Sequence, residues 1–365
     1  MTNRKNQYFP ETVTHPGLTL GEKLDELGMG SKEFSVRTGK PEKTISQILS
    51  GESSITPEMA VMFEDVLHIP ANFWLNRQKQ YNEAIARQKR KEDLVAAVEW
   101  SKQFPYSDMA RLGWVKVTRN PEEKVSNLFQ YFSIATPKAF EDYYFKQKLK
   151  VNFRISLAYT KKPFAFAAWL RQGEIKANEM KAFPYDARKF ESSLSEIKNL
   201  MVSHPDDFFQ QLQKICLEAG VKVVYTPCLP GASAHGSTRW IGDNPLIQLS
   251  ARYKQNDIFW FTFFHEAAHI LKHGKKFVTL ENVDYSLEDK KKEEEANQFA
   301  IHWTFSAEQE KEVLAQPFLT EESIVAFSKK FNTHPAMIIG RLHHKEIVPY
   351  SVGRKFIKSI DLSEN

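Results

Sequence analysis

The stretch DIFWFTFFHEAAHIL, from Asp257 to Leu271, contains the longest apolar run of this chain of 365 residues. Apart from Thr262, every residue between Ile258 and Phe264 is apolar, and no Pro or Gly interrupts the pattern before Gly274. A helix that is apolar on all sides is typical of the interior of a domain. We therefore expect a buried helix at the centre of the C-terminal half.

This predicted helix carries the motif His-Glu-x-x-His at His265, Glu266 and His269. Residues four apart lie one turn apart on the same side of a helix, so both imidazoles can bind a single Zn²⁺. Glu266 lies beside them and can accept a proton from water that the metal activates. The motif also occurs by chance, so the assignment depends on a third ligand.

Two positions come into question for a third metal ligand that is a histidine, and neither is suitable. The residue ten positions after His265, where one class of zinc peptidases has a histidine, is Lys275. His273 is eight positions from His265, about 12 Å along a helix, which is too far to share a metal ion with it. We interpret His273 as a cap at the helix C-terminus, an outer partner of the ligands, or an exposed residue.

A carboxylate from the next helix remains. Residues 292–300 read KEEEANQFA, and Ala296 and Ala300 share a face beside that of Glu295, which allows close helix packing. We predict Glu295 as the third ligand, with Glu294 as the alternative, in a gluzincin-like His-His-Glu site with an open fourth position. Without the motif, the three consecutive glutamates would be interpreted as a solvated first turn of a helix, which the helix dipole favours.

Residues 1–92 consist of short helical patterns separated by Gly, Ser and Pro. One helix is expected to end near Gly39 and the next to begin at Pro41 and end before Gly51. Two short helices around a tight turn are typical of a helix-turn-helix, whose second helix enters the major groove of DNA. The side chains that could reach bases or phosphates are Lys40, Glu42, Lys43, Thr44 and Gln47. Residues 1–90 contain 12 Lys and Arg against 11 Asp and Glu, so a five-helix protein-interaction module is the alternative.

The composition excludes several classes of protein. A charged fraction of 26% and an aromatic fraction of 13% are unlike those of a disordered chain, and a net charge of +5 neither requires nor forbids a nucleic-acid-binding face. Cys216 and Cys228 are too few for a disulfide scaffold and are expected to be reduced. We see no signal peptide and no apolar run near the roughly 20 residues that span a bilayer, so we expect a cytoplasmic protein without a membrane partner.

The fold class is predicted as mainly α with a small β-sheet (α+β). Three strands are expected at residues 221–225, 236–241 and 246–249. The strand at 246–249 or its neighbour could pair with an extended peptide substrate, or the sheet could be purely structural. The predicted domains are a five-helix DNA-binding domain at 1–92, an aromatic-rich helical coupling region at 93–200, a zincin-like domain at 201–320, and a helical extension packing on it at 321–365.

A peptidase also needs a group that stabilises negative charge on the substrate carbonyl oxygen. The candidates are Arg341, His343, His302, Tyr285 and Arg239. His302 lies seven residues after Glu295 and could instead support that ligand or be an ordinary core histidine.

Two segments resemble known families. Residues 43–51 (KTISQILSG), 55–60 (ITPEMA) and 72–78 (NFWLNRQ) resemble, in order and spacing, the XRE-type helix-turn-helix of the HigA/VapI antitoxin group. This resemblance implies a domain that binds operator DNA, usually as a homodimer. Residues from about 205 to 345 resemble the ImmA/IrrE metallopeptidases, through PLIQLS at 245–250, FWFTFFHEAAHIL at 259–271 and EEEANQFA at 293–300. This second resemblance implies Zn²⁺ held by His265, His269 and Glu295, Glu266 as general base, and a repressor or antitoxin as partner.

The combined prediction is a DNA-binding transcriptional regulator fused to a zinc-dependent endopeptidase, which cleaves a regulatory protein or itself. The alternative is a non-enzymatic DNA-binding antitoxin or sensor whose zinc is structural. A structural site needs no general base, so Glu266 favours the enzyme. Mn²⁺ or Fe²⁺ could also occupy a site with these ligands.

Overall fold

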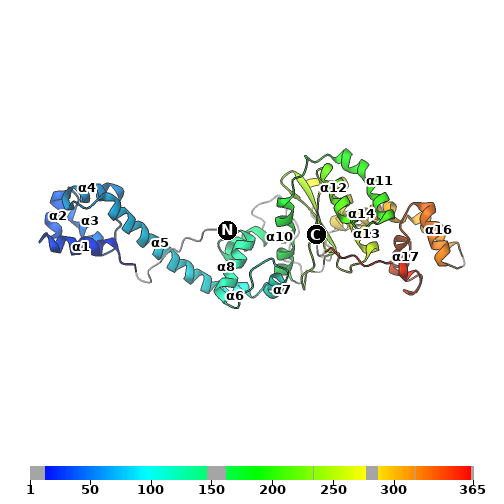
Figure 1. The fold of residues 1–365 in the computed structure, drawn as a ribbon, viewed down its shortest axis with the longest axis horizontal. Coiled ribbons are helices and arrows are strands. Elements are labelled where there is room, and N and C mark those ends of the chain that lie inside the picture. The colour runs from blue at the N-terminus through cyan, green and yellow to red at the C-terminus, as the bar shows by residue number, and fades with distance from the viewer. Residues whose placement is uncertain (1–12, 146–161, 233, 277–286, 317, 363–365) are drawn as a thin grey trace. The chain divides into compact units, whose positions relative to one another are not determined.

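The structure is a computed structural model that describes residues 13–145, 162–232, 234–276, 287–316 and 318–362. It divides into two compact units, Met1–Ala96 and Ala97–Asn365 (Figure 1). The predicted fold class is confirmed, because the chain is mostly helical with a small mixed β-sheet. Within the described ranges, no helix is both long enough and apolar enough to cross a bilayer.

The first unit is a group of helices around an apolar core. In its described part the helices are α1 (Pro16–Glu26), α2 (Ser31–Thr38), α3 (Glu42–Leu49), α4 (Pro57–Leu67) and α5 (Ala71–Ala96). The core includes Leu20, Leu24, Phe34, Ile45, Ile48, Phe63 and Trp74. Helices α2 and α3 with the turn between them form the predicted helix-turn-helix, and Ile45 and Ile48 anchor α3 in the core.

Helix α1 approaches the end of α3 closely at Gly17. A Cβ atom added there would lie 1.7 Å from the backbone oxygen of Ile48, and no side-chain rotation can relieve a clash with backbone. We expect Gly17→Ala to lower the free energy of unfolding of this unit by at least about 1–3 kcal/mol, as overpacking does. Hydrogen exchange of the α1 and α3 amides in the full chain measures this effect.

Gly21→Ala is the matched control. It lies one turn further along α1, and its added Cβ would be 3.7 Å from Leu49 Cδ2, an ordinary contact. We expect unchanged or slightly greater protection there, because Ala favours a helix interior over Gly. Equal protection in the Gly17→Ala and Gly21→Ala proteins would contradict the prediction.

The second unit contains the sheet, formed by β1 (Lys222–Tyr225), β2 (Gly236–Ile241) and β3 (Asn244–Leu249). The order is β1-β3-β2, with β1 parallel and β2 antiparallel to β3. All three predicted strands are confirmed. Because β3 lies in the middle with both edges paired, the suggestion that residues 246–249 bind a peptide by strand pairing is wrong. In the described part of the chain, β1 and β2 are the outer strands.

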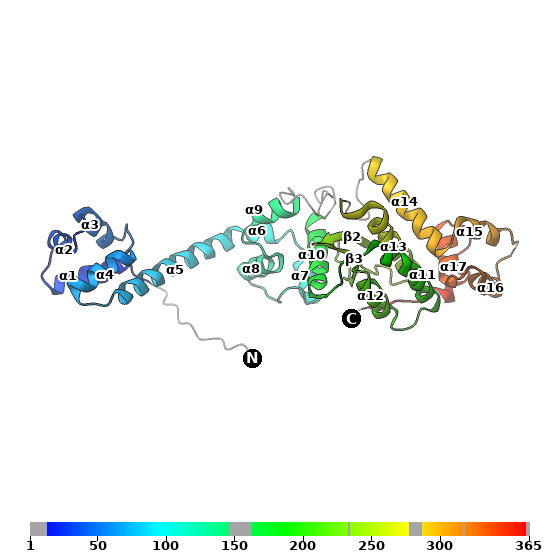
Figure 2. The same cartoon turned by 90° about the horizontal axis from the view of Figure 1, so that it is seen from above.

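Different helices cover the two faces of the sheet. Successive residues of a strand point to opposite faces, so neighbouring residues of β2 contact different helices. On one face, Arg239 donates to the Leu170 carbonyl at 2.6 Å, and Gln248 to the Trp169 carbonyl at 2.7 Å, both in α10 (Pro163–Glu179). On the other, the Thr238 hydroxyl donates to the Glu266 carbonyl at 3.1 Å in α13 (Asn256–Ala268). Figure 2 shows β2 and β3 between α10 and α13.

The remaining described elements of the second unit surround this sandwich. They are α6 (Val98–Ser101), α7 (Tyr106–Arg111), α8 (Pro121–Phe132), α9 (Pro137–Phe140), a π-helical turn η1 (Glu141–Phe145), α11 (Ala187–Ser203), α12 (Phe208–Glu218), a π-helical turn η3 (His269–His273), η4 (Gly274–Lys276), α14 (Leu287–Thr304), α15 (Ala307–Leu314), α16 (Glu321–Phe331), α17 (Pro335–His344) and η5 (Arg354–Phe356). The predicted boundary at 200 falls inside α11, and that at 92 falls inside α5. The division into four domains stays a prediction.

The second unit shows how the aromatic residues of the middle region and the C-terminal segment pack. The buried rings of Trp100, Phe104 and Phe140 contact one another, as expected for a core. Residues of α17, including Ile338 and Leu342, belong to the same apolar core as those of α13. The C-terminal segment therefore packs against the helix that carries the His-Glu-x-x-His motif.

Candidate metal centre

Helix α13 places the motif in the interior of the second unit. Its sequence is apolar on all sides, and it packs against α14, α17 and the sheet. His265 is 4% exposed, and Glu266 and His269 are fully buried. At His269 the α-helix changes into the π-helical turn η3, and such turns are frequent at functional sites.

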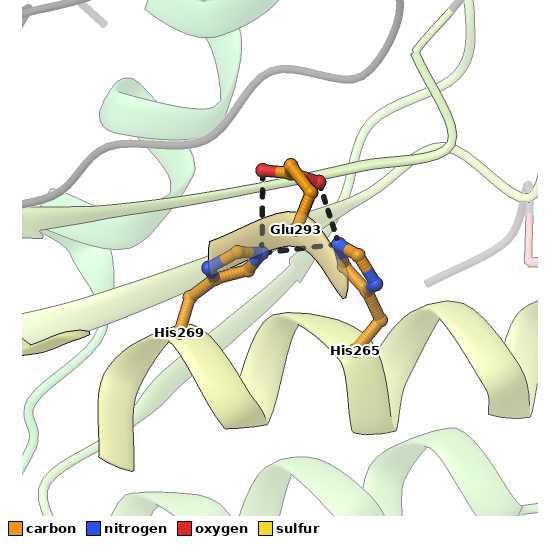
Figure 3. Close-up of side chains that lie close together, drawn as sticks. All are labelled: His265, His269 and Glu293. Carbon is orange, nitrogen blue, oxygen red and sulfur yellow. Dashed lines mark hydrogen bonds and ion pairs between the residues drawn. The ribbon is translucent and has the colours of Figure 1, made fainter. Parts of the chain in front are cut away.

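Glu293 of α14 lies together with His265 and His269, and the three side chains form a group that could hold a metal ion (Figure 3). The two Nε2 atoms are 3.0 Å apart, and Glu293 Oε2 lies 3.3 Å from His265 Nε2. Glu293 Oε1 lies 3.6 Å from His269 Nε2. Ligands about 2.0 Å from a tetrahedral metal ion are separated by about 3.3 Å, so the donor atoms of these three residues have the spacing of a zinc site.

The protonation of the group also fits a metal ion. Burial, and then the neighbouring His265 and His273, hold the pKa of His269 well below its usual range, so its imidazole stays neutral as a ligand must. Glu293 Oε1 is buried and makes no hydrogen bond to any of the described residues. A buried carboxylate oxygen without a hydrogen bond is costly unless a cation compensates it. The donor set therefore suits Zn²⁺.

The prediction of Glu295 as the third ligand is corrected by this geometry. Glu295 points to His273, with 3.1 Å between its Oε2 and His273 Nε2, and Glu294 is exposed and accepts a hydrogen bond from Gln298. The reason is helical rotation of about 100° per residue, which turns Glu295 roughly 200° away from Glu293.

One face of α14 carries Glu293, Ala296, Asn297 and Ala300, at the spacing i, i+3, i+4 and i+7. Both alanines are fully buried, which brings this face against α13. Sequence reasoning missed Glu293 and Asn297, although this spacing relative to the alanines was the available signal. Asn297 Oδ1 lies 3.0 Å from His265 Nδ1, so it can orient that ligand.

Glu266 lies against the beginning of β2. A Cβ atom added to Gly236 would be 2.7 Å from Glu266 Oε1 and 2.8 Å from Thr262 Cγ2. The glycine thus leaves room for the carboxylate beside this outer strand.

The candidates for stabilising the carbonyl oxygen make their described contacts elsewhere. Arg341 forms an ion pair with Glu310, and His343 donates to the Val352 carbonyl at 2.9 Å. His302 is exposed and lies edge-on to Trp303. Arg239 faces α10 on the opposite side of the sheet from α13. The structure therefore does not bring these four to the His265, His269 and Glu293 group, and Tyr285 lies outside the described residues.

The predicted DNA-contacting residues lie at the start of α3 and just before it. Glu42 and Lys43 are exposed, and Thr44 and Gln47 are half-buried. Lys40 forms an ion pair with Glu58 at 2.7 Å. Of the five, Lys43 is thus the exposed cation at the beginning of the second helix of the motif.

Comparison with known proteins found a family match in the second unit and a relative that aligns with a shorter segment of the chain. The IrrE N-terminal-like domain family (Peptidase_M78) matches residues 216–343, which include the metal-binding group. The uncharacterized HTH-type transcriptional regulator YddM of Escherichia coli (strain K12) is 35% identical over 71 residues, 20% of this chain and 76% of that protein.

Two solved structures are similar to about a fifth of the chain. An addiction module antidote protein of the HigA family from Coxiella burnetii is 28% identical, over 23% of this chain and 92% of that chain, with a TM-score of 0.22. A Pseudomonas aeruginosa protein crystallised with its operator DNA is 24% identical, over 21% of this chain and 84% of that chain, with a TM-score of 0.21. Over about a fifth of its length this chain belongs to the HTH-type transcriptional regulators, and its residues 216–343 match the IrrE N-terminal-like domain family.

Proposed function

We propose that this protein is a DNA-binding transcriptional regulator whose second unit is a zinc-dependent endopeptidase. The observation that carries the peptidase proposal is that Glu293 of α14 meets His265 and His269 of the buried helix α13, in which Glu266 directly follows His265. In this proposal the three residues hold Zn²⁺ and Glu266 is the general base.

His265, His269 and Glu293 would hold a Zn²⁺ ion, which would supply Lewis acidity toward a peptide carbonyl and a water molecule. Glu266 accepts the proton of the attacking water as its oxygen adds to the carbonyl carbon. When the C–N bond breaks, Glu266 delivers this proton to the departing amine. The remaining proton of the water then passes from the new carboxylic acid to the amine, so the products are a carboxylate and an ammonium group. Because the Glu266 side chain is buried, bulk water competes little for the proton that it carries.

The substrate in this proposal is an extended segment of a regulatory protein of the repressor or antitoxin type, or of this chain itself. Strand β2 supports this choice because it is an outer strand and begins at Gly236, beside Glu266. An extended peptide paired with β2 is recognised mainly by backbone hydrogen bonds. We place the protein in the cytoplasm, acting as a homodimer on operator DNA.

A proteome-derived peptide mixture tests the peptidase on many candidate substrates at once. We expect mass spectrometry to detect new peptide termini after incubation with the zinc-loaded protein, and none after removal of zinc by a chelator. No new termini at any zinc concentration would favour the alternative, a non-enzymatic regulator with a structural metal.

The DNA-binding proposal predicts a loss of affinity when α3 is altered. Lys43→Ala combined with Gln47→Ala removes one exposed cation and one polar side chain from this helix. We expect the dissociation constant for the best-retained genomic fragment to rise about 10-fold or more, because each base contact contributes about 1–3 kcal/mol. If Lys43 contacts a phosphate, the slope of log affinity against log salt falls by about 1.

The control is Lys79→Ala, which removes an exposed cation from α5 instead. Fluorescence anisotropy of the labelled fragment should show wild-type affinity for this variant. Equal weakening by the control would mean that net charge, rather than α3, determines binding. Failure of the wild-type protein to retain any genomic fragment would end the proposal.

A further inference from the structure

A chain of hydrogen bonds runs from the candidate metal ligand His269 to the protein surface. His269 Nδ1 lies 2.9 Å from His273 Nδ1, and His273 Nε2 lies 3.1 Å from Glu295 Oε2. The His273 side chain is 5% exposed, whereas that of Glu295 is 59% exposed.

One pattern of donors and acceptors satisfies this whole chain when His269 binds a metal through Nε2. The proton of His269 is then on Nδ1 and is donated to His273 Nδ1, which must accept. His273 consequently carries its own proton on Nε2 and donates it to Glu295, which can only accept. Each nitrogen and oxygen along this series of hydrogen bonds is therefore either a donor or an acceptor. The Nε2 lone pair of His269 remains for the metal.

We propose that His273 and Glu295 are positioning residues that orient His269 and increase the affinity of the site for Zn²⁺. This inference rests on the metal site proposed above. The carboxylate makes the His269 imidazole a stronger ligand through His273, as outer hydrogen-bond partners of metal-binding histidines do. His265 is held differently, by the neutral amide of Asn297.

Helix α13, with its continuation η3, and helix α14 carry the metal-binding group and also the residues of this hydrogen-bond chain. The π-helical turn η3 contains both His269 and His273, with their ring centres 5.0 Å apart. Helix α14 contributes Glu293 to the metal group and Glu295 to His273, two residues apart in sequence. These opposite-facing carboxylates therefore act on the same site, one as a ligand and one through a histidine.

Zinc affinity of the full-length protein, measured by competition with a chromophoric chelator, tests the proposal. We expect Glu295→Ala and His273→Ala each to weaken binding about 10–100-fold while one zinc per chain is still bound. Glu295→Gln keeps an acceptor oxygen for His273 and should recover part of the loss. Glu294→Ala, which removes the adjacent exposed carboxylate, should bind zinc as the wild type does.

The double variant separates positioning from a general charge effect. Because Glu295 acts through His273, the combined His273→Ala and Glu295→Ala protein should bind zinc no more weakly than His273→Ala alone. The visible spectrum of the Co²⁺-substituted protein should change in both single variants and not in Glu294→Ala, because it reports ligand geometry.

Three results would overturn the inference: wild-type affinity in Glu295→Ala, additive losses in the double variant, or an equal loss in Glu294→Ala. In each of these cases the wild type still binds zinc and the proposed peptidase stands. Absence of zinc binding by the wild type would instead overturn both the proposed function and the inference. Glu295 is exposed, so its replacement leaves the core of the unit intact.

Discussion

Replacing Glu293 with Gln is expected to reduce the affinity for zinc by more than about 100-fold, beyond the 10–100-fold typical of outer partners of a metal site. The amide is a far weaker zinc ligand than the carboxylate, and only His265 and His269 would remain in the group. The side chain keeps its size, so the packing of α14 against α13 is preserved. Elemental analysis after dialysis and chelator competition measure the effect.

The neighbouring glutamates supply matched controls for this result. Glu294→Gln should keep one zinc per chain with wild-type affinity, because Glu294 is exposed and lies outside the metal-binding group. Glu295→Gln should also keep its zinc, with an affinity between those of the other two variants. Loss of metal from Glu295→Gln together with normal binding by Glu293→Gln would restore Glu295 as the ligand.

Replacing Glu266 with Gln is expected to leave zinc binding unchanged and to lower the rate of peptide cleavage about 10²–10⁴-fold. The amide fills the same space beside Gly236 but cannot accept a proton from water. Quantitative mass spectrometry of the peptide mixture, with equal amounts of zinc-loaded wild type and variant, measures the rate.

Two outcomes of this experiment would contradict the assignment of Glu266. Cleavage at the wild-type rate would show that another group acts as the base. Loss of zinc along with activity would show that Glu266 is needed to hold the metal. Retention of DNA binding in the Glu266→Gln protein confirms that the first unit is intact.

Local sequence signals predicted most of the first unit correctly. Gly39 ends α2 in the left-handed conformation with φ 63°, and α3 ends at Leu49, before Gly51, as predicted. These features depend on residues a few positions apart, so the sequence contains them directly. Details of the caps differ, since Pro41 precedes α3 as its cap with ψ 136° instead of beginning the helix.

The sheet shows where local information ends. Composition and turn residues located all three strands, yet they did not reveal that β3 lies between β1 and β2. Strand order depends on how α10 and α13 cover the two faces, and these helices come from segments about 90 residues apart. The outer strand beside Glu266 is consequently β2.

By itself, the sequence determined that His265 and His269 share one side of a buried helix, because helical periodicity relates residues four apart. It also determined that a carboxylate from the next helix would join them. Only the tertiary structure decided which one, because each of the three consecutive glutamates points about 100° from the last and the packing shows which face of α14 meets α13. The burial of Ala296 and Ala300 against α13 turned Glu293 toward the histidines and left Glu295 for His273. Helix rotation is determined by packing between distant segments, which a single stretch of sequence does not contain.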